Sequence, residues 1–366
     1  MKAQRICELG VQTYPRSSLF HEDLGQYVNA LGQYESGINE SLEALRLAPY
    51  DPFLYRQVVH TYLLLNKLEE AEAVSKKAHS KGLDSDLIDT RYEIAFYRHD
   101  TAEMAQQVAA AAGKPGEEDL VLAFEADTSS YFGHLEKARQ FSRRAAESVE
   151  QAGQKDTVAG YHAASALREA IDGNSETSRR EATIARERST GRDTAYGIAL
   201  ALAFAGDANQ AQELTDDLAR RFPEDTITQF NYLPTLRAKL ALLHSRPQEA
   251  LEILEVATPY ELGLPAFSFY NWPNLYPAYV RGEAYLAAHQ GTEAAAEFQK
   301  ILDHRGIVLN EPIGALAHLQ LGRVYALQGD TAKSRAAYQD FLTLWKDADR
   351  DIPILKEAKA EFARLQ

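Results

Sequence analysis

The sequence ALAHLQLGRVYALQGDTAKSRAAYQDFL, residues 315–342, contains two helical patterns separated by a short break. Gly322 and Tyr325 lie one turn apart on the first predicted helix, where a small residue beside a large ring lets two helices pack closely. Gly329 then interrupts the pattern, and an alanine-rich second helix carries Tyr338. The stretch therefore predicts a helix, a tight turn and a second helix.

The same spacing of small and aromatic residues recurs roughly every 34 residues through most of the chain. Ala, Leu, Glu, Gln and Arg dominate the composition, which favours helix nearly throughout. The predicted fold class is all-α, a right-handed α-solenoid of about nine helix pairs with a C-terminal capping helix. The positions that mark the nine units are Gly32, Tyr62, Tyr92, Gly133, Gly173, Gly206, Ala238, Gly282 and Gly322.

Two interruptions of the repeat pattern divide the chain. Gly113 and Gly116 flank a proline, which predicts an irregular joint, and TPYELGLPAFSFYNWPN has too many prolines and aromatic rings for a plain helix. The predicted organisation is about three N-terminal repeats in residues 1–112, the joint in 113–118, middle repeats in 119–257, an aromatic insert in 258–274, C-terminal repeats in 275–348 and the capping helix in 352–366.

The charge balance narrows the classes of partner. Asp and Glu number 53 against 39 Lys and Arg, a net charge of −14 that disfavours binding to nucleic acid or to an anionic membrane surface. The longest apolar run, AYGIALALAFAG at residues 195–206, is shorter than the roughly 20 residues that a membrane span needs. We therefore expect a soluble region without membrane contact of its own.

No pattern in the sequence predicts catalysis. The ten histidines show no paired ligand spacing, no GxSxG elbow is present, and Cys7 is the single cysteine. The many carboxylates fall in predicted turns and on outer helix faces. We expect no metal, no cofactor and no enzymatic activity in this chain.

The repeat positions resemble those of the tetratricopeptide repeat, with small residues, aromatic rings and an alanine at the characteristic places of each unit. Four longer strings further resemble the C-terminal repeat region of eukaryote-like serine/threonine protein kinases of soil bacteria. They are GRDTAYGIALALAFAGDANQAQ, RRFPEDTITQFNYLPTLRAKLAL, PAYVRGEAYLAAHQGTEAAAEFQKILDHRGIVLNEPIGALAHL and YQDFLTLWKDADRDIPILKEAKAEFARLQ.

The kinase resemblance carries implications for location and for activity. In that family a catalytic domain precedes the repeats, commonly with a membrane span between them, so the resemblance implies a cytoplasmic or an extracytoplasmic repeat region. This chain has no GxGxxG loop, VAIK-type lysine or DFG motif, and its nearest match to HRD is His304-Arg305-Gly306, without the aspartate. The chain therefore lacks the residues for phosphoryl transfer by that mechanism.

With catalysis disfavoured, the function that we expect is the binding of a protein or peptide partner. Self-association is a further expectation. In repeats of this type the first helix of each pair lines a concave groove, and tyrosines with Arg and Lys suit a peptide groove. The predicted groove residues are Arg56, His60, Tyr97, Tyr196, Tyr232, Lys239, Tyr279 and Arg323, together with Phe269, Tyr270 and Trp272 of the insert. The alternatives are a small-molecule receptor or cryptic enzyme with a cavity closed by residues 258–274, and a purely structural spacer.

Overall fold

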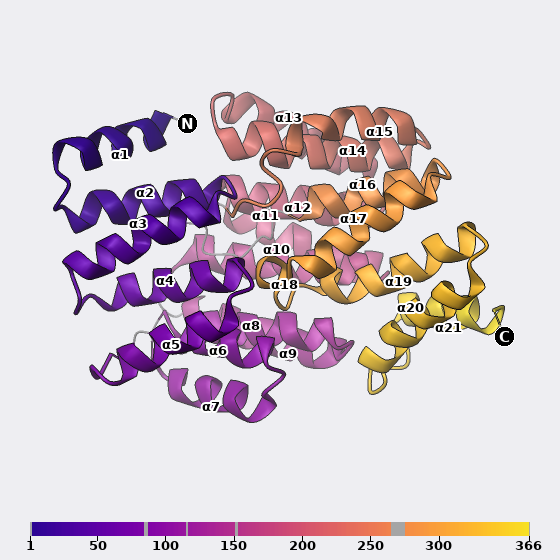
Figure 1. The fold of residues 1–366 in the computed structure, drawn as a ribbon. Coiled ribbons are helices and arrows are strands. Elements are labelled where there is room, and N and C mark those ends of the chain that lie inside the picture. Colours follow the sequence, from indigo (N-terminus) through magenta and orange to yellow (C-terminus); the bar gives the residue numbers. More distant parts are fainter. Residues whose placement is uncertain (1, 84–86, 115, 151–152, 265–274, 366) are drawn as a thin grey trace. The chain divides into compact units, whose positions relative to one another are not determined.

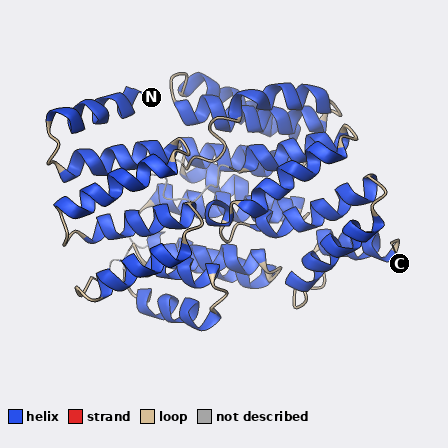
Figure 2. Cartoon of the chain, viewed as in Figure 1, coloured by secondary structure: helices blue, strands red, loops and turns tan. Residues whose placement is uncertain are grey.

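The computed structural model describes residues 2–83, 87–114, 116–150, 153–264 and 275–365, and the regular elements in these ranges are helices (Figures 1 and 2). Within them, nine consecutive helix pairs follow one another, and a final helix comes after the last pair. The predicted all-α solenoid is confirmed. None of the described helices is both long and apolar enough to cross a bilayer.

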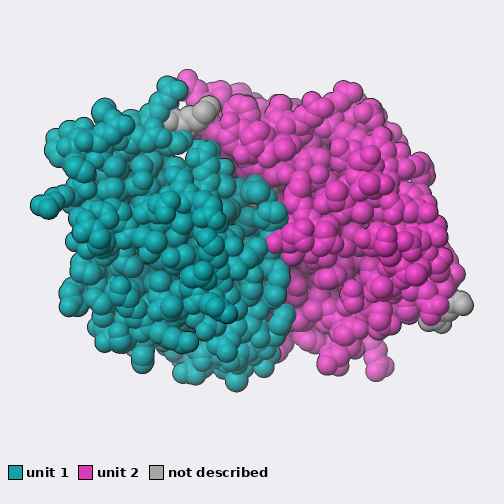
Figure 3. Space-filling view, in the orientation of Figure 1, with its two compact units in different colours: residues 1–121, 262–274, 304–309 teal, residues 122–261, 275–303, 310–366 magenta. Residues whose placement is uncertain are grey.

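The chain forms two compact units (Figure 3). Unit 1 comprises residues 1–121 together with 262–274 and 304–309, and unit 2 comprises residues 122–261, 275–303 and 310–366. Two short stretches that lie late in the sequence therefore belong to the N-terminal unit. The repeat pattern gave no indication of this, since packing between distant segments leaves no periodic signal in the sequence.

Unit 1 contains the first three helix pairs, repeats 1–3, after one additional helix. The core of repeat 2 is made by Tyr55, Val58, Leu63 and Ala71, each fully buried. The helices are α1 (Lys2–Thr13), α2 (Ser18–Ala30), α3 (Tyr34–Leu47), α4 (Pro52–Leu64), α5 (Leu68–His79), α6 (Ile88–Tyr97), α7 (Thr101–Ala111) and the short α18 (Arg305–Val308).

Unit 2 contains repeats 4–9 and the terminal helix α21 (Pro353–Ala363). Its helix pairs are α8 (Glu118–Tyr131), which begins just before the unit boundary, and α9 (Leu135–Glu150); α10 (Lys155–Ile171) and α11 (Ser175–Arg188); α12 (Arg192–Phe204) and α13 (Ala208–Arg221); α14 (Leu233–Leu243) and α15 (Pro247–Leu254); α16 (Tyr276–Ala287) and α17 (Gly291–Asp303); α19 (Pro312–Leu327) and α20 (Thr331–Leu344). A π-helical turn, η2 (Thr228–Tyr232), precedes α14, and a 3₁₀ turn, η3 (Glu255–Ala257), follows α15.

Each pair is turned by one residue with a positive φ directly after its first helix. In repeat 2 the amide of Asn66 donates to the carbonyl of Leu63 and the amide of Lys67 to that of Tyr62, both at 2.8 Å, which closes the end of α4. The equivalent residues are Gly32, Asn66, His99, Gly133, Gly173, Gly206, Ser245, His289 and Gly329. This conformation explains the recurrent glycine in the sequence, and it also shows which other residues replace glycine.

The two helices of a pair pack closely at a small residue. A Cβ atom added to Gly322 would lie 2.8 Å from the ring of Tyr338, and one added to Gly282 would lie 2.7 Å from the ring of Phe298. The close contact predicted at Gly322 is confirmed. The partner ring, Tyr338, comes from the second helix of the same pair.

Unit 2 closes on itself, because its last repeat contacts its first. The indole Nε1 of Trp345 donates to the carbonyl of Tyr131 at 2.9 Å, and the amide of Asp349 donates to the carbonyl of Gly133 at 2.9 Å. Helix α21 buries Ile354, Leu355 and Ala358. A polar contact 3.4 Å long also joins the amide of Ile354 to the carbonyl of Asp172, between α21 and repeat 5.

Candidate protein interaction site

The charged residues predicted for the groove pair with carboxylates of the neighbouring repeat or of α21. Arg56 pairs with Asp89, and His60 lies 3.2 Å from Glu93. Lys239 Nζ lies 2.7 Å from Glu283, and the guanidinium of Arg323 lies 3.0 Å from Glu361. These side chains therefore hold successive helices in register, and a partner would compete with those carboxylates for them.

The tyrosines predicted for the groove in unit 2 are buried. The rings of Tyr196 and Tyr232 stack on each other with centroids 3.7 Å apart, and the hydroxyl of Tyr279 accepts a hydrogen bond of 3.0 Å from Gln320. Burial raises the pKa of all three phenols. None of the three offers accessible surface to a partner in this structure, because the inner helices of unit 2 pack directly against one another.

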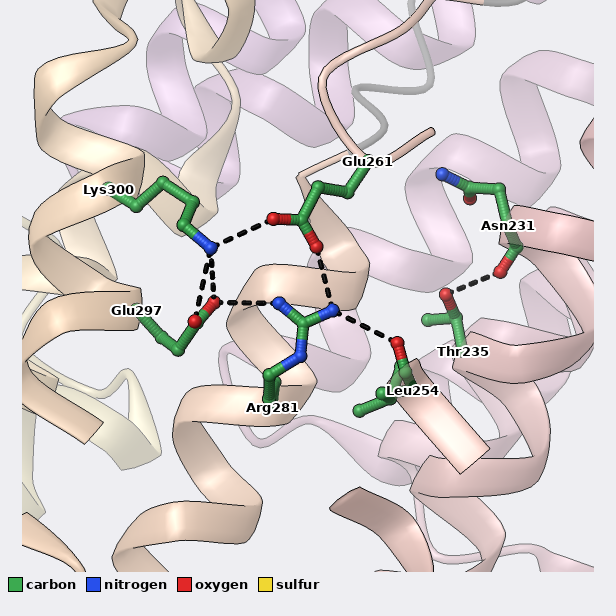
Figure 4. Close-up of polar contacts among 7 residues, drawn as sticks. All are labelled: Asn231, Thr235, Leu254, Glu261, Arg281, Glu297 and Lys300. Atoms are coloured by element: carbon green, nitrogen blue, oxygen red, sulfur yellow. Dashed lines mark hydrogen bonds and ion pairs between the residues drawn. The ribbon is translucent and has the colours of Figure 1, made fainter. Parts of the chain in front are cut away.

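Phe269, Tyr270 and Trp272 lie outside the described residues, but the chain that leads to them is described. Glu261 ends this stretch of unit 2, and its carboxylate is bound by Arg281 at 2.7 Å and by Lys300 at 2.8 Å (Figure 4). Glu297 completes the network 3.0 Å from Arg281. The network fixes Glu261, which lies within the predicted insert 258–274, onto helices α16 and α17.

An open cleft of about 220 Å³ lies in unit 1 at the beginnings of α4 and α6, and we call it the Arg56 cleft. The side chain of Arg56 is 44 % exposed there, and the neighbouring Phe53 is 43 % exposed. Burial raises the pKa of Asp89, against the lowering effect of Arg56. The cleft is lined by Pro52, Phe53, Arg56, Ile88, Asp89, Gly116, Glu117, Leu120 and Val121. Apolar side chains beside a paired charge suit an apolar anchor of a protein partner.

The turns at the opposite ends of these helices hold segments of the same chain. We define the turn edge as residues 29–34, 63–67 and 97–100 of unit 1. The hydroxyl of Tyr34 donates to the carbonyl of Leu262, and the amide of Leu264 approaches the carbonyl of Asn29 at 3.5 Å. Residues 262–264 are thus held at the turn of repeat 1 through backbone groups.

The second segment at the turn edge is residues 304–309, which we call the docked segment. The guanidinium of Arg305 donates to the carbonyl of Tyr97 at 2.9 Å and lies 4.4 Å from the centre of that ring. The amide of Gly306 donates to Oδ1 of Asn66 at 2.9 Å. Tyr97, predicted to face a partner, therefore faces an arginine of its own chain. The tripeptide His304-Arg305-Gly306 belongs to this contact.

A larger cleft, of about 450 Å³, was not predicted from the sequence. It lies in unit 2 among α11, α12 and α13, with an apolar floor that includes Ile198 and Leu214. The charges at its rim are paired, with Arg186 2.7 Å from Glu213 and Arg221 2.7 Å from Asp217. Helical periodicity places these residues on the outer faces of separate helices, and it carries no signal that their faces enclose a space.

Groups for catalysis are sparse in the described part of the chain. No cluster of three or more His, Cys, Asp or Glu side chains within the described ranges is arranged to hold a metal ion. Cys7 is buried, and burial together with the nearby charge of Asp23 raises the pKa of its thiol, which disfavours the nucleophilic thiolate.

The nine successive helix pairs of the described ranges define the class of protein as an all-α helical repeat protein. The family model of the tetratricopeptide repeat matches residues 316–348, which cover most of α19 and all of α20. No curated protein sequence matches the chain.

Three solved structures match most of the chain at low sequence identity. Yeast Tom70 matches 99 % of this chain and 91 % of its own at 10 % identity and a TM-score of 0.42. The APC/C hetero-tetramer Cut9-Hcn1 matches over 95 % of this chain and 76 % of that one at 13 % identity and a TM-score of 0.43. The TPR domain of P58(IPK) matches over 99 % and 92 % at 13 % identity and a TM-score of 0.26.

Proposed function

We propose that this chain is a non-catalytic interaction scaffold that binds a protein or peptide partner in the Arg56 cleft of unit 1. Solenoids of helix pairs typically bind partners on the surface that their first helices line. The observation that carries the proposal is the pairing of a half-exposed phenylalanine, Phe53, with a half-exposed guanidinium, Arg56, at one open cleft.

The burial of the three predicted groove tyrosines of unit 2 supports this choice of site. Tyr196, Tyr232 and Tyr279 contribute to the packing of unit 2, whereas Arg56 keeps nearly half of its side chain in solvent. Aromatic residues and arginine contribute most of the binding energy in many interfaces, since they combine a large contact area with directed hydrogen bonds. An apolar side chain of the partner would lie between Phe53 and Leu120, and a carboxylate of the partner would compete with Asp89 for Arg56.

The resemblance to repeat regions of bacterial serine/threonine kinases supports a finer proposal. The chain would be the scaffold or sensor region of a kinase signalling protein, and its partner a component of the same signalling system. Self-association through the same cleft is the other form of protein binding that we propose. The chain would be located in the cell wherever its parent protein is located.

Site-specific crosslinking tests the proposal. A photo-reactive amino acid at Phe53 should capture a discrete protein in the native host, and the same group at Leu243, which is similarly exposed at 38 %, should not. The captured protein, once purified, should bind the wild-type chain and bind Arg56→Ala at least about tenfold more weakly. Arg246→Ala is the matched control, because Arg246 is a comparably exposed arginine in an ion pair outside the cleft. Equal capture at both positions would reject the cleft as the site.

A further inference from the structure

The docked segment is bound in the way that a foreign peptide would be bound. Its polar contacts with the turn edge are made by a backbone amide and one guanidinium, and the next two residues, Ile307 and Val308, are buried aliphatic side chains. It is four residues of helix followed by a sharp bend, and in sequence it lies between two helices of unit 2. Recognition at this surface thus depends on a short linear sequence.

Glycine is required at one position of that sequence. A Cβ atom added to Gly306 would lie 1.6 Å from the carbonyl oxygen of Leu63, which is backbone and cannot move aside. The same close approach allows the amide of Gly306 to reach Oδ1 of Asn66. The turn edge therefore accepts a residue without a side chain here and excludes all others.

Arginine is favoured at the preceding position. The guanidinium of Arg305 lies over the ring of Tyr97 and donates to the carbonyl of the same residue. A second contact, 3.4 Å long, joins it to Nε2 of His99. A planar cation can stack on a ring and donate in its plane at once, which an ammonium group cannot do. Arg305 is exposed, so this part of the surface is open to solvent.

The docked segment is held with local strain. Leu309, the residue that follows α18, has φ 41° and ψ −120°, a conformation that is unfavourable for a residue with a side chain. Such backbone strain is a cost of the docked state and would be released if the segment left the turn edge. Its release would favour replacement by an unstrained peptide that makes the same contacts.

We propose that the turn edge of unit 1 is a second peptide-binding site, that its ligand is an Arg-Gly-aliphatic-aliphatic sequence of a protein partner, and that residues 305–308 occupy it until such a partner displaces them. The site is separate from the Arg56 cleft. Phe53 and Leu64 are eleven positions apart on α4, which corresponds to roughly 16 Å along a helix. The turn edge can therefore be filled while the cleft stays open.

The experiment uses the full chain and a fluorescent peptide that spans residues 303–310, with fluorescence polarisation as the measurement. Gly306→Ala in the protein should expel the docked segment, and the peptide should then bind at least about tenfold more tightly than to wild type, since a tethered competitor has an effective concentration near millimolar. The same peptide with Gly306→Ala should not bind. Adding Tyr97→Ala to the Gly306→Ala protein should abolish binding, whereas adding Phe53→Ala should leave it unchanged.

Three results would overturn the proposal. The first is a folded Gly306→Ala protein, as judged by circular dichroism, that does not bind the peptide, and the second is equal binding of both peptides. The third is a wild-type dimer in sedimentation that Arg305→Ala dissociates, which would make a second copy the occupant. If Gly306→Ala does not fold, Arg305→Ala removes only an exposed side chain and should still increase binding of the wild-type peptide.

Discussion

Replacing Arg281 by methionine tests the buried network that includes Glu261. The guanidinium is 7 % exposed and lies between Glu261, 3 % exposed, and Glu297, 12 % exposed (Figure 4). Removing one partner of a buried ion pair costs about 3–5 kcal/mol, because the remaining charge stays desolvated without its partner. Lys300 still contacts both carboxylates, so we expect the free energy of unfolding to fall by about 3 kcal/mol, near the lower end of this range.

Urea unfolding of the full chain measures the free energy of unfolding. Hydrogen exchange of residues 255–264 shows whether the loss of stability is confined to this segment. A loss of this size lowers the Tm by roughly 6–12 °C in a domain of 150–250 residues. Adding Glu261→Gln should recover about 1–2 kcal/mol, since a neutral amide is less costly to bury without a cation. Arg246→Met, which breaks an exposed pair with Glu249, should cost under about 1 kcal/mol. Equal losses for Arg281→Met and Arg246→Met would refute the reasoning.

Two further predictions concern the packing within and between repeats. Gly322→Ala places a Cβ atom 2.8 Å from the ring of Tyr338 and should destabilise the chain by about 1–3 kcal/mol in urea unfolding, and an unchanged midpoint would contradict this contact. Burial opposes protonation of His60, but the charge and hydrogen bond of Glu93 outweigh it and raise the pKa of His60 above 6.5. The pair therefore stabilises the fold below pH 6.5 and loses this contribution as the pH rises through the raised pKa, so Glu93→Gln should reduce the pH dependence of stability, and a profile unchanged by it would count against the pair.

The repeat architecture was predictable because its signals are local. Gly322 beside Tyr325 and the break at Gly329 describe one helix pair without reference to the rest of the chain. The structure adds that residues such as Asn66 and His289 take the same positive φ as the glycines. A single repeat with such a residue lacks the glycine that marks the turn. The turn can still be placed from the spacing of the neighbouring repeats.

The candidate sites were predictable in part. Arg56 lies at an open cleft, as its place on the first helix of repeat 2 suggested, but Tyr196 and Tyr232 stack on each other in the core of unit 2. The residue that buries each of these side chains lies about one repeat or more away in the sequence, and the periodicity of the sequence does not indicate such a contact. The docked segment was missed for the same reason, because Gly306 and Leu63 are brought together by the fold alone.

The sequence by itself determined the class of fold, the helix pairs and the turns, since these depend on helix propensity, on spacing within about 34 residues and on glycine where φ is positive. The tertiary structure decided which of the inward-facing residues stay accessible. The cause is packing between segments that are distant in sequence, because Tyr196 stacks on Tyr232 in unit 2 and Arg305 lies over the ring of Tyr97 in unit 1. Accessibility depends on contacts between distant segments, and only the folded chain brings those segments together.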